Sequence, residues 1–124
     1  MILLDRSVMN EEMIFTEASV QNRTVQKILD YINMNLNDDI NIDSISGELY
    51  LNRSYVMHLF KKTTGCTIGN YITGKRLFQA KKLICDGMPV TEACYRSGFK
   101  NYSDFYHAFR KKYEFLPKDS KDII

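Results

Sequence analysis

Apolar residues recur at helical spacing along most of the chain, and they predict an all-α protein. In the first clear segment, residues 24–36, the apolar positions follow at i, i+3, i+4, i+7 and i+11. These positions are Val25, Ile28, Leu29, Ile32 and Leu36. Thr24 precedes them, and its hydroxyl is suited to cap an amphipathic helix that starts there.

Two shorter helices are expected next. Asp43 is placed to cap a short helix whose buried side contains Ile45, Ser46 and Leu49. Asn52 is placed to cap a second one running to about residue 64. The inward positions of that second helix are Val56, Leu59 and Phe60, and Gly65 follows as its C-terminal stop.

A longer helix should connect this first half to the second. Thr67 can cap it, and it should continue through about Asp86, where Gly87 and Pro89 close it. At 1.5 Å per residue, roughly 19 residues span about 29 Å. That length could hold two modules nearly one DNA turn apart.

The segment from Val90 to Tyr113 has the pattern of a complete helix-turn-helix. Its first helix carries Ala93 and Cys94 on one face, and Gly98 lies where that helix must stop. Asn101 can cap the second helix. The inward residues of that helix are Phe105 and Phe109, and Pro117 can open a short last helix. About seven helices are predicted in all.

The two halves repeat one another. Aligning Phe60 with Phe109 sets LFKKTTGCTI against AFRKKYEFLP. The offset is 48 before the turn (Ala93 and Ile45, 93 − 45) and 49 after it (Phe105 and Val56, 105 − 56), so one residue was added inside the turn. Two copies are too few for a solenoid and indicate duplication of one small module.

This pattern divides the chain. Residues 1–23 have no clean helical stripe and are interpreted as an N-terminal arm or the remnant of a preceding domain. Residues 24–124 form the domain proper. Within it, 24–66 is expected to be the first helix-turn-helix lobe, 67–86 the linker helix and 87–124 the second lobe.

Charge is distributed very unevenly. Residues 53–112 carry 12 basic and 3 acidic side chains, whereas residues 24–52 carry 1 and 5. A solvated helical face could explain a run of charge. The excess of basic residues in one block instead favours a nucleic-acid partner.

The exposed faces of the two second helices supply the candidate contacts. The candidates for DNA base edges are Arg53, Ser54, Met57, His58, Tyr102, Ser103, Tyr106 and His107. Those for phosphates are Asn52, Lys61, Lys62, Asn101, Arg110, Lys111 and Lys112. For Tyr102 and Tyr106, packing against neighbouring helices is an equally good explanation.

Other classes of protein find little support. Cys66, Cys85 and Cys94 show no CxxC spacing, and His58 and His107 have no second ligand at i+3 or i+4 on a shared face, so neither disulfides nor a metal site are expected. No catalytic motif is present, and we expect neither an enzyme nor a cofactor. No apolar run approaches the roughly 18 residues of a membrane helix, and the start lacks the basic flank of a signal peptide, so a cytoplasmic protein is expected.

The chain resembles the arabinose-regulator (AraC/XylS) family of bacterial transcription regulators over roughly residues 24–124. The second module carries the most specific part of the resemblance, with Ala93, Gly98, Phe99, Phe105, Phe109, Lys111, Lys112 and Pro117 at the family's spacing. The first module and linker extend it through Tyr55, Leu59, Phe60, Lys61, Lys62, Gly65, Tyr71, Ile72, Arg76, Leu77, Ala80 and Leu83.

The resemblance implies two homeodomain-like helix-turn-helix lobes joined by a long helix, with two recognition helices addressing successive major-groove segments of double-stranded DNA. Phe60, Gly65, Gly98, Phe99, Phe105 and Phe109 would then be structural. Family members usually carry a separate effector-binding or dimerisation domain, which 23 residues cannot contain. The chain is therefore expected to be either a stand-alone short member or, as the favoured alternative, the DNA-binding part of a longer regulator, with that domain missing from the chain.

Several residues depart from the family pattern. Tyr50 stands where the first module's turn often has Gly, which requires an unfavourable backbone angle or another turn shape. Ser46 replaces a usual Ala, Glu114 a usual Gly, and Ile68 a frequent Pro.

The two histidines are a further departure. His58 and His107 are equivalent (107 − 58 = 49) and stand where Arg is frequent. Lacking the fixed charge and the bidentate fork of Arg, they predict base contacts that are weaker or more pH-sensitive than the family's.

The sequence therefore predicts the DNA-binding part of a bacterial transcription regulator, with double-stranded DNA as partner. The alternative is a helical protein-interaction module that contacts RNA polymerase or a partner regulator through the acidic surface of residues 24–52.

Overall fold

The computed structural model describes the backbone of residues 6–119 and the side chains of residues 20–119. Within that range the chain forms six α-helices and one 3-10 helix, and no strand. In chain order these are α1 (Arg6–Met34), α2 (Ile42–Leu49), α3 (Arg53–Thr64), α4 (Ile68–Cys85), α5 (Val90–Arg96), α6 (Tyr102–Tyr113) and η1 (Pro117–Asp119). The all-α class and the approximate number of helices are confirmed.

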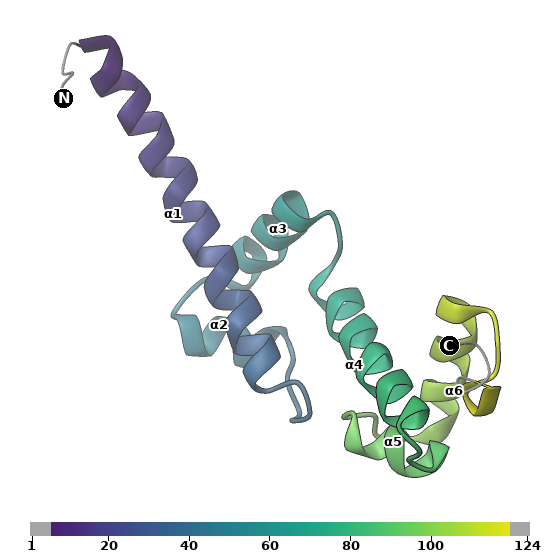
Figure 1. The fold of residues 1–124 in the computed structure, drawn as a ribbon. Coiled ribbons are helices and arrows are strands. Elements are labelled where there is room, and N and C mark those ends of the chain that lie inside the picture. The colour runs from purple at the N-terminus through teal and green to yellow at the C-terminus, as the bar shows by residue number, and fades with distance from the viewer. Residues whose placement is uncertain (1–5, 120–124) are drawn as a thin grey trace.

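The helices form two lobes on either side of α4 (Figure 1). The first lobe packs α1, α2 and α3 around a core centred on Ile28, Ile45 and Phe60, to which α4 contributes Ile68 and Ile72. The second packs α5 and α6 around Phe105 and Phe109. The residues that α4 contributes to this second core are Leu77, Ala80 and Ile84. One helix thus supplies a wall to each core from successive parts of its length.

The three phenylalanines that were predicted to point inward lie in the cores of the two lobes. Phe60, Phe105 and Phe109 are fully buried. The ring of Phe60 meets that of Tyr71 edge-on at 5.6 Å, and Phe99 packs edge-on against Phe105 at 5.2 Å. These aromatic contacts fix the helix packing inside each lobe.

Two predicted helix starts are wrong. α1 begins at Arg6, and Thr24 lies inside it, with its hydroxyl donating to the carbonyl of Val20 (2.9 Å). Residues 6–24 contain no Gly or Pro to interrupt a helix, so a capping residue type at position 24 does not start one. The helix therefore crosses the boundary drawn at residue 23.

The cap of α2 is Asn41, two residues before the predicted Asp43. The Asn41 side chain accepts from the amide of Ser44 (2.9 Å), and the Ser44 hydroxyl accepts from the amide of Asn41 (3.0 Å). This reciprocal pair satisfies two amide groups that the helix start leaves free. Asp43 instead lies in the first turn, where its negative charge is favourable.

The turn inside the first lobe takes the first of the two alternatives that Tyr50 left open, the unfavourable backbone angle. Tyr50 is in the left-handed region with φ of 56°, at the C-terminal end of α2. The corresponding turn of the second lobe places Gly98 at φ of 99°. Tyr50 therefore carries a conformational cost that glycine avoids at the corresponding turn of the other lobe.

The lobes touch through the segment between α1 and α2. Arg76 of α4 donates from Nε to the carbonyl of Leu36 (2.8 Å) and from Nη2 to the carbonyl of Asp38 (2.7 Å). Lys100, after α5, forms an exposed ion pair with Asp39 (3.1 Å). Helix α4 and the second lobe therefore both hold the same loop of the first.

We expect Phe60→Ala and Phe109→Ala each to lower the free energy of unfolding by about 3 to 5 kcal/mol, because each removes a fully buried ring and leaves a cavity. Urea denaturation followed by circular dichroism measures the change. The control is Phe78→Ala, since Phe78 is 52% exposed, and it should change stability far less. Equal losses at the three positions would contradict the assignment of the two cores.

Tyr50→Gly should raise the free energy of unfolding by about 1 kcal/mol, because it relieves the left-handed backbone. The side chain of Tyr50 is 94% exposed and contributes little packing. Tyr50→Ala is the control, since it removes the ring but keeps the Cβ that makes φ unfavourable. Stabilisation by Ala as large as that by Gly would show that the ring, and not the backbone, is responsible.

Candidate nucleic-acid interface

Helix α3 presents one polar face to solvent over a buried apolar face. Asn52 caps its start by accepting from the amide of Tyr55 (3.2 Å), and Gly65 ends it at φ of 84°. Val56, Leu59 and Phe60 point into the first core. The predicted contact residues of this helix are all exposed, namely Asn52, Arg53, Ser54, Met57, His58, Lys61 and Lys62.

Helix α6 repeats this arrangement in the second lobe. Asn101 caps it by accepting from the amide of Asp104 (2.7 Å), and its own amide group donates to the Asp104 carboxylate (2.8 Å). Phe105 and Phe109 point inward. The exposed predicted contacts are Asn101, Tyr102, Ser103, His107, Arg110, Lys111 and Lys112.

The two tyrosines of α6 combine packing with exposure. Tyr106 is half-buried, and its ring lies 6.2 Å from that of Tyr102 and 5.7 Å from His107. Tyr102 also packs on Phe105 at 5.8 Å. Burial is the main cause that raises the pKa of the Tyr102 phenol, so this hydroxyl stays protonated and able to donate a hydrogen bond.

Arg53 is already engaged within the first lobe. Its Nη1 lies 3.2 Å from the carboxylate of Asp43 in the first turn of α2, and both side chains are well exposed. An exposed ion pair of this kind contributes little to stability. The guanidinium can therefore exchange Asp43 for another acceptor at small cost.

The Lys112 side chain reaches back to the linker helix α4. Its Nζ lies beside Gly74 of α4, 3.2 Å from where a Cβ would be, and 5.6 Å from the centroid of the Tyr113 ring. Lys81 approaches the same ring at 4.7 Å. Lys112 thus rests against the linker helix, although the sequence predicts it as a phosphate contact together with Arg110 and Lys111.

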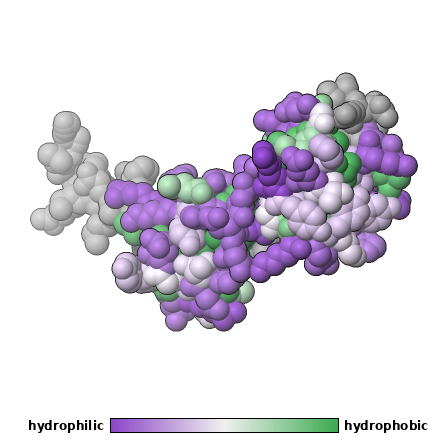
Figure 2. All heavy atoms as spheres, turned by 90° about the horizontal axis from the view of Figure 1, so that it is seen from below, coloured by the Kyte–Doolittle hydropathy of each residue, from purple (hydrophilic) through white to green (hydrophobic). Residues whose placement is uncertain are grey.

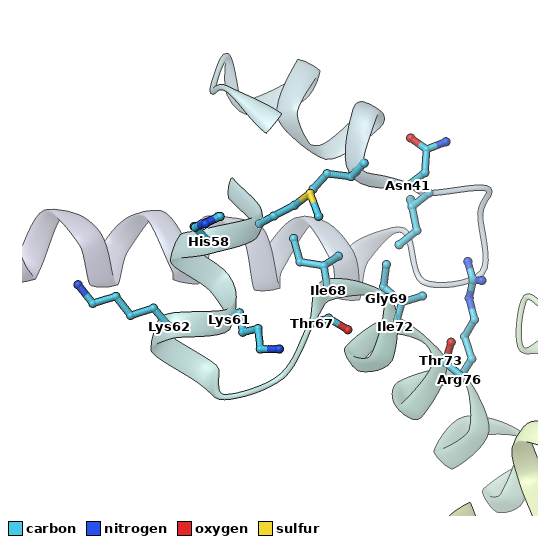
Figure 3. A pocket seen from close by; sticks show the side chains of 13 residues that line it. Asn41, His58, Lys61, Lys62, Thr67, Ile68, Gly69, Ile72, Thr73 and Arg76 are labelled. Carbon is cyan, nitrogen blue, oxygen red and sulfur yellow. The ribbon is translucent and has the colours of Figure 1, made fainter. Parts of the chain in front are cut away.

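A groove of about 770 Å³ runs beside α3. Its walls come from Met57, His58 and the two lysines of α3, from the start of α4, and from residues 40–42 (Figure 3). Lys61 points toward Thr67 across the groove, and Lys62 points away. Ile68 and Ile72 form part of the apolar floor, and no acidic side chain lines the groove.

This groove could not be predicted from the sequence, because it is formed where three segments meet. The sequence pattern predicts Thr67 only as a helix cap and assigns no role to Ile40 or Ile42. These residues line the groove because of the direction in which α4 extends from the first lobe, and hydrophobic periodicity does not predict that direction. The basic character of the groove agrees with the excess of basic over acidic residues between 53 and 112, which the sequence does show.

Viewed from below, the molecule has two rounded masses with a narrower middle, and hydrophilic residues cover most of that face (Figure 2). Among the described residues, no helix is long and apolar enough to cross a membrane. The same part of the chain has no group of three or more His, Cys, Asp or Glu side chains arranged to hold a metal ion.

Comparison with known proteins agrees with this geometry. A family described as a helix-turn-helix domain matches residues 45–122. An uncharacterised HTH-type transcriptional regulator from the cgkA 5′ region of Pseudoalteromonas carrageenovora is 37% identical over 105 residues, which is 85% of this chain and 63% of the relative. The chain thus spans less than two thirds of that relative's length.

Solved structures show the same fold. A transcriptional regulator of the AraC-type DNA-binding class from Chromobacterium violaceum superposes with a TM-score of 0.75 at 17% identity, covering 84% of this chain and 94% of that one. The DNA-binding domain of AdpA, solved with a target DNA, superposes with a TM-score of 0.74 at 18% identity, covering 80% and 90%. At these identities the likeness establishes the fold alone.

Proposed function

The chain belongs to the AraC-type helix-turn-helix family of transcription regulators, and from that premise we propose that it binds double-stranded DNA sequence-specifically through α3 and α6.

The observation that carries this proposal is the repeated construction of α3 and α6. Each has 12 residues, starts at an Asn cap, buries apolar residues against its lobe and exposes polar and basic side chains. A helix with one exposed polar face has the dimensions to enter the major groove. The similarity of fold to a domain solved on its target DNA supports the same assignment.

The linker helix sets the scale of the site. α4 has 18 residues, which span about 27 Å at 1.5 Å per residue. Successive major-groove segments on one side of a duplex are about 34–36 Å apart. With one lobe packed at each end of α4, the two reading helices can address adjacent turns, and because their exposed residues differ, the preferred site is asymmetric.

Within this proposal the contacts divide by chemistry. Lys61, Lys62, Arg110 and Lys111 are proposed to neutralise phosphates, which supplies most of the affinity and makes it salt-dependent. The exposed residues nearer the start of each helix are proposed to read base edges. These are Arg53, Ser54, Met57 and His58 on α3, with Tyr102, Ser103, Tyr106 and His107 on α6.

Two of the predicted phosphate contacts have another role in the structure. Asn52 and Asn101 use their side-chain oxygens to cap their own helices, which holds the helix starts in a defined conformation. Lys112 rests against α4. We propose that these three contribute less to DNA affinity than the four phosphate contacts named above.

The test is footprinting on random genomic fragments, with affinity measured at about 50 and about 200 mM salt. We expect a protected window of about two helical turns and a steep loss of affinity with salt. A helical protein-interaction module would give no protected window. That result would overturn the proposal.

Lys61→Ala should reduce the slope of log affinity against log salt by about 0.9, the contribution of one neutralised phosphate. Lys27→Ala is the matched control, because Lys27 is exposed on α1, outside both reading helices. It removes the same charge and should leave the slope nearly unchanged. Equal effects of the two substitutions would mean that only total charge matters.

His58→Gln and His107→Gln should each lower the affinity for a preferred duplex more than the affinity for random DNA, because both side chains are proposed to read base edges, whereas phosphate contacts act on any sequence. Fluorescence anisotropy with the two kinds of duplex measures the ratio of the two affinities. If both variants keep the ratio of the unaltered chain, the histidines have no part in reading bases.

A further inference from the structure

The two lobes have separate cores, and α4 passes from one to the other within a few residues. Ile72 is the last α4 residue in the first core, and Leu77 is the first in the second. Only positions 73–76 lie between them. The angle between the lobes therefore depends on what holds this short stretch of α4 to the first lobe.

Arg76 is the residue of that stretch that reaches back. Its guanidinium donates to two carbonyls of the loop after α1, those of Leu36 (2.8 Å) and Asp38 (2.7 Å). Figure 3 shows the side chain rising from α4 toward this loop. Hydrogen bonds from a charged, planar donor to two fixed acceptors are both strong and directional.

The second lobe closes on the same point. A Cβ added to Gly98 would lie 2.8 Å from Arg76 Nε and 3.0 Å from the carbonyl oxygen of Leu36. The backbone of the second lobe's turn thus packs directly against the bonded pair. The first lobe, the linker helix and the second lobe meet at one guanidinium.

A second polar link between the lobes is weaker. Lys100 and Asp39 are 3.1 Å apart, but their side chains are 75% and 73% exposed. An ion pair so exposed to solvent contributes little. The Arg76 side chain is only partly accessible, and burial lowers the pKa of its guanidinium, an effect that Asp39 partly offsets.

We propose that Arg76 is a positioning residue that fixes the angle between the lobes, and so sets the spacing between the two DNA segments that the chain accepts.

This inference rests on the proposed function. It predicts that the chain discriminates between spacings of the two DNA segments, which DNA contacts alone do not require. Adding one base pair between the two segments moves the second by about 3.4 Å and turns it by about 35° around the axis. Lobes held at a fixed angle cannot follow that change. Lobes that lack the Arg76 bonds, and are joined by α4 and the exposed Lys100–Asp39 ion pair, can follow it in part.

The experiment begins with a duplex that the unaltered chain recovers from a random library. Affinity is then compared for this duplex and for versions with one base pair inserted or removed between the protected segments. We expect the affinity of the unaltered chain to fall at least about tenfold on either change, an effect comparable to that of one mismatched base pair. The affinity of the Arg76→Ala variant should fall less than about threefold.

Two further variants separate positioning from charge. Arg76→Lys keeps the charge but cannot supply the planar pair of donors, so it should discriminate spacing as poorly as Arg76→Ala. Lys75→Ala removes a charge from the neighbouring, exposed position of α4. It should retain the full discrimination of the unaltered chain, even if its overall affinity falls.

The orientation of the lobes can also be measured without DNA. Residual dipolar couplings of backbone amides report the angle between two folded lobes, and well-dispersed amide signals show that both remain folded. Both Arg76 variants should change the fitted angle or broaden its distribution, and Lys75→Ala should not.

The outcomes distinguish this inference from the proposed function. If the unaltered chain recovers no preferred duplex, the proposed function fails and the dipolar couplings alone decide the role of Arg76. Alternatively, a preferred duplex is found and both Arg76 variants keep the ratio of affinities for the original and altered spacings that the unaltered chain shows. That result overturns the inference but leaves the proposed DNA binding intact. Unchanged dipolar couplings in both variants would overturn it equally.

Discussion

The arrangement of the molecule depends on one charged group shared among three segments. Arg76 projects from the linker helix and is bonded to two backbone carbonyls of the loop that follows α1. The turn of the second lobe approaches the same group so closely that only glycine fits at position 98. Packing within each lobe explains how α3 and α6 are presented, but it does not relate one to the other. That relation comes from the guanidinium and from the way α4 divides its apolar residues between two cores.

Each lobe is built by the same physical means, and the differences lie in the turns. A buried phenylalanine anchors the second helix of each pair, and an asparagine caps it. The second lobe turns through a glycine, whereas the first turns through Tyr50 at the same kind of left-handed angle. The first lobe thus has a strained residue where the second has glycine. At the end of the second helix of each pair the order is reversed, since Glu114 has φ of 62° where the first lobe has Gly65.

Much of this could be read from the sequence because it is local. Helix ends follow from Asn52, Thr67 and Asn101, whose side chains act over three residues, and inward faces follow from periodicity. Two predicted helix starts were wrong. Asn41 caps α2 in place of the nearby Asp43, which is also a capping residue type. Thr24 lies inside α1, because no residue before it interrupts the helix. The groove beside α3 and the bonds of Arg76 were not foreseeable, since each depends on how separate segments pack. Arg76, for example, bonds to carbonyls 40 and 38 positions before it. The resemblance placed Arg76 in the linker but did not indicate its partners.

The separation of the cores has a consequence for how such a chain can change over generations. Because no described core residue belongs to both lobes, a substitution that reshapes the packing beneath α3 leaves the support of α6 untouched. Each lobe can therefore accumulate substitutions, or acquire a new DNA preference, while the other lobe keeps its original one. Such independence would produce the difference now seen between the exposed residues of α3 and α6, if both lobes arose by duplication of one module.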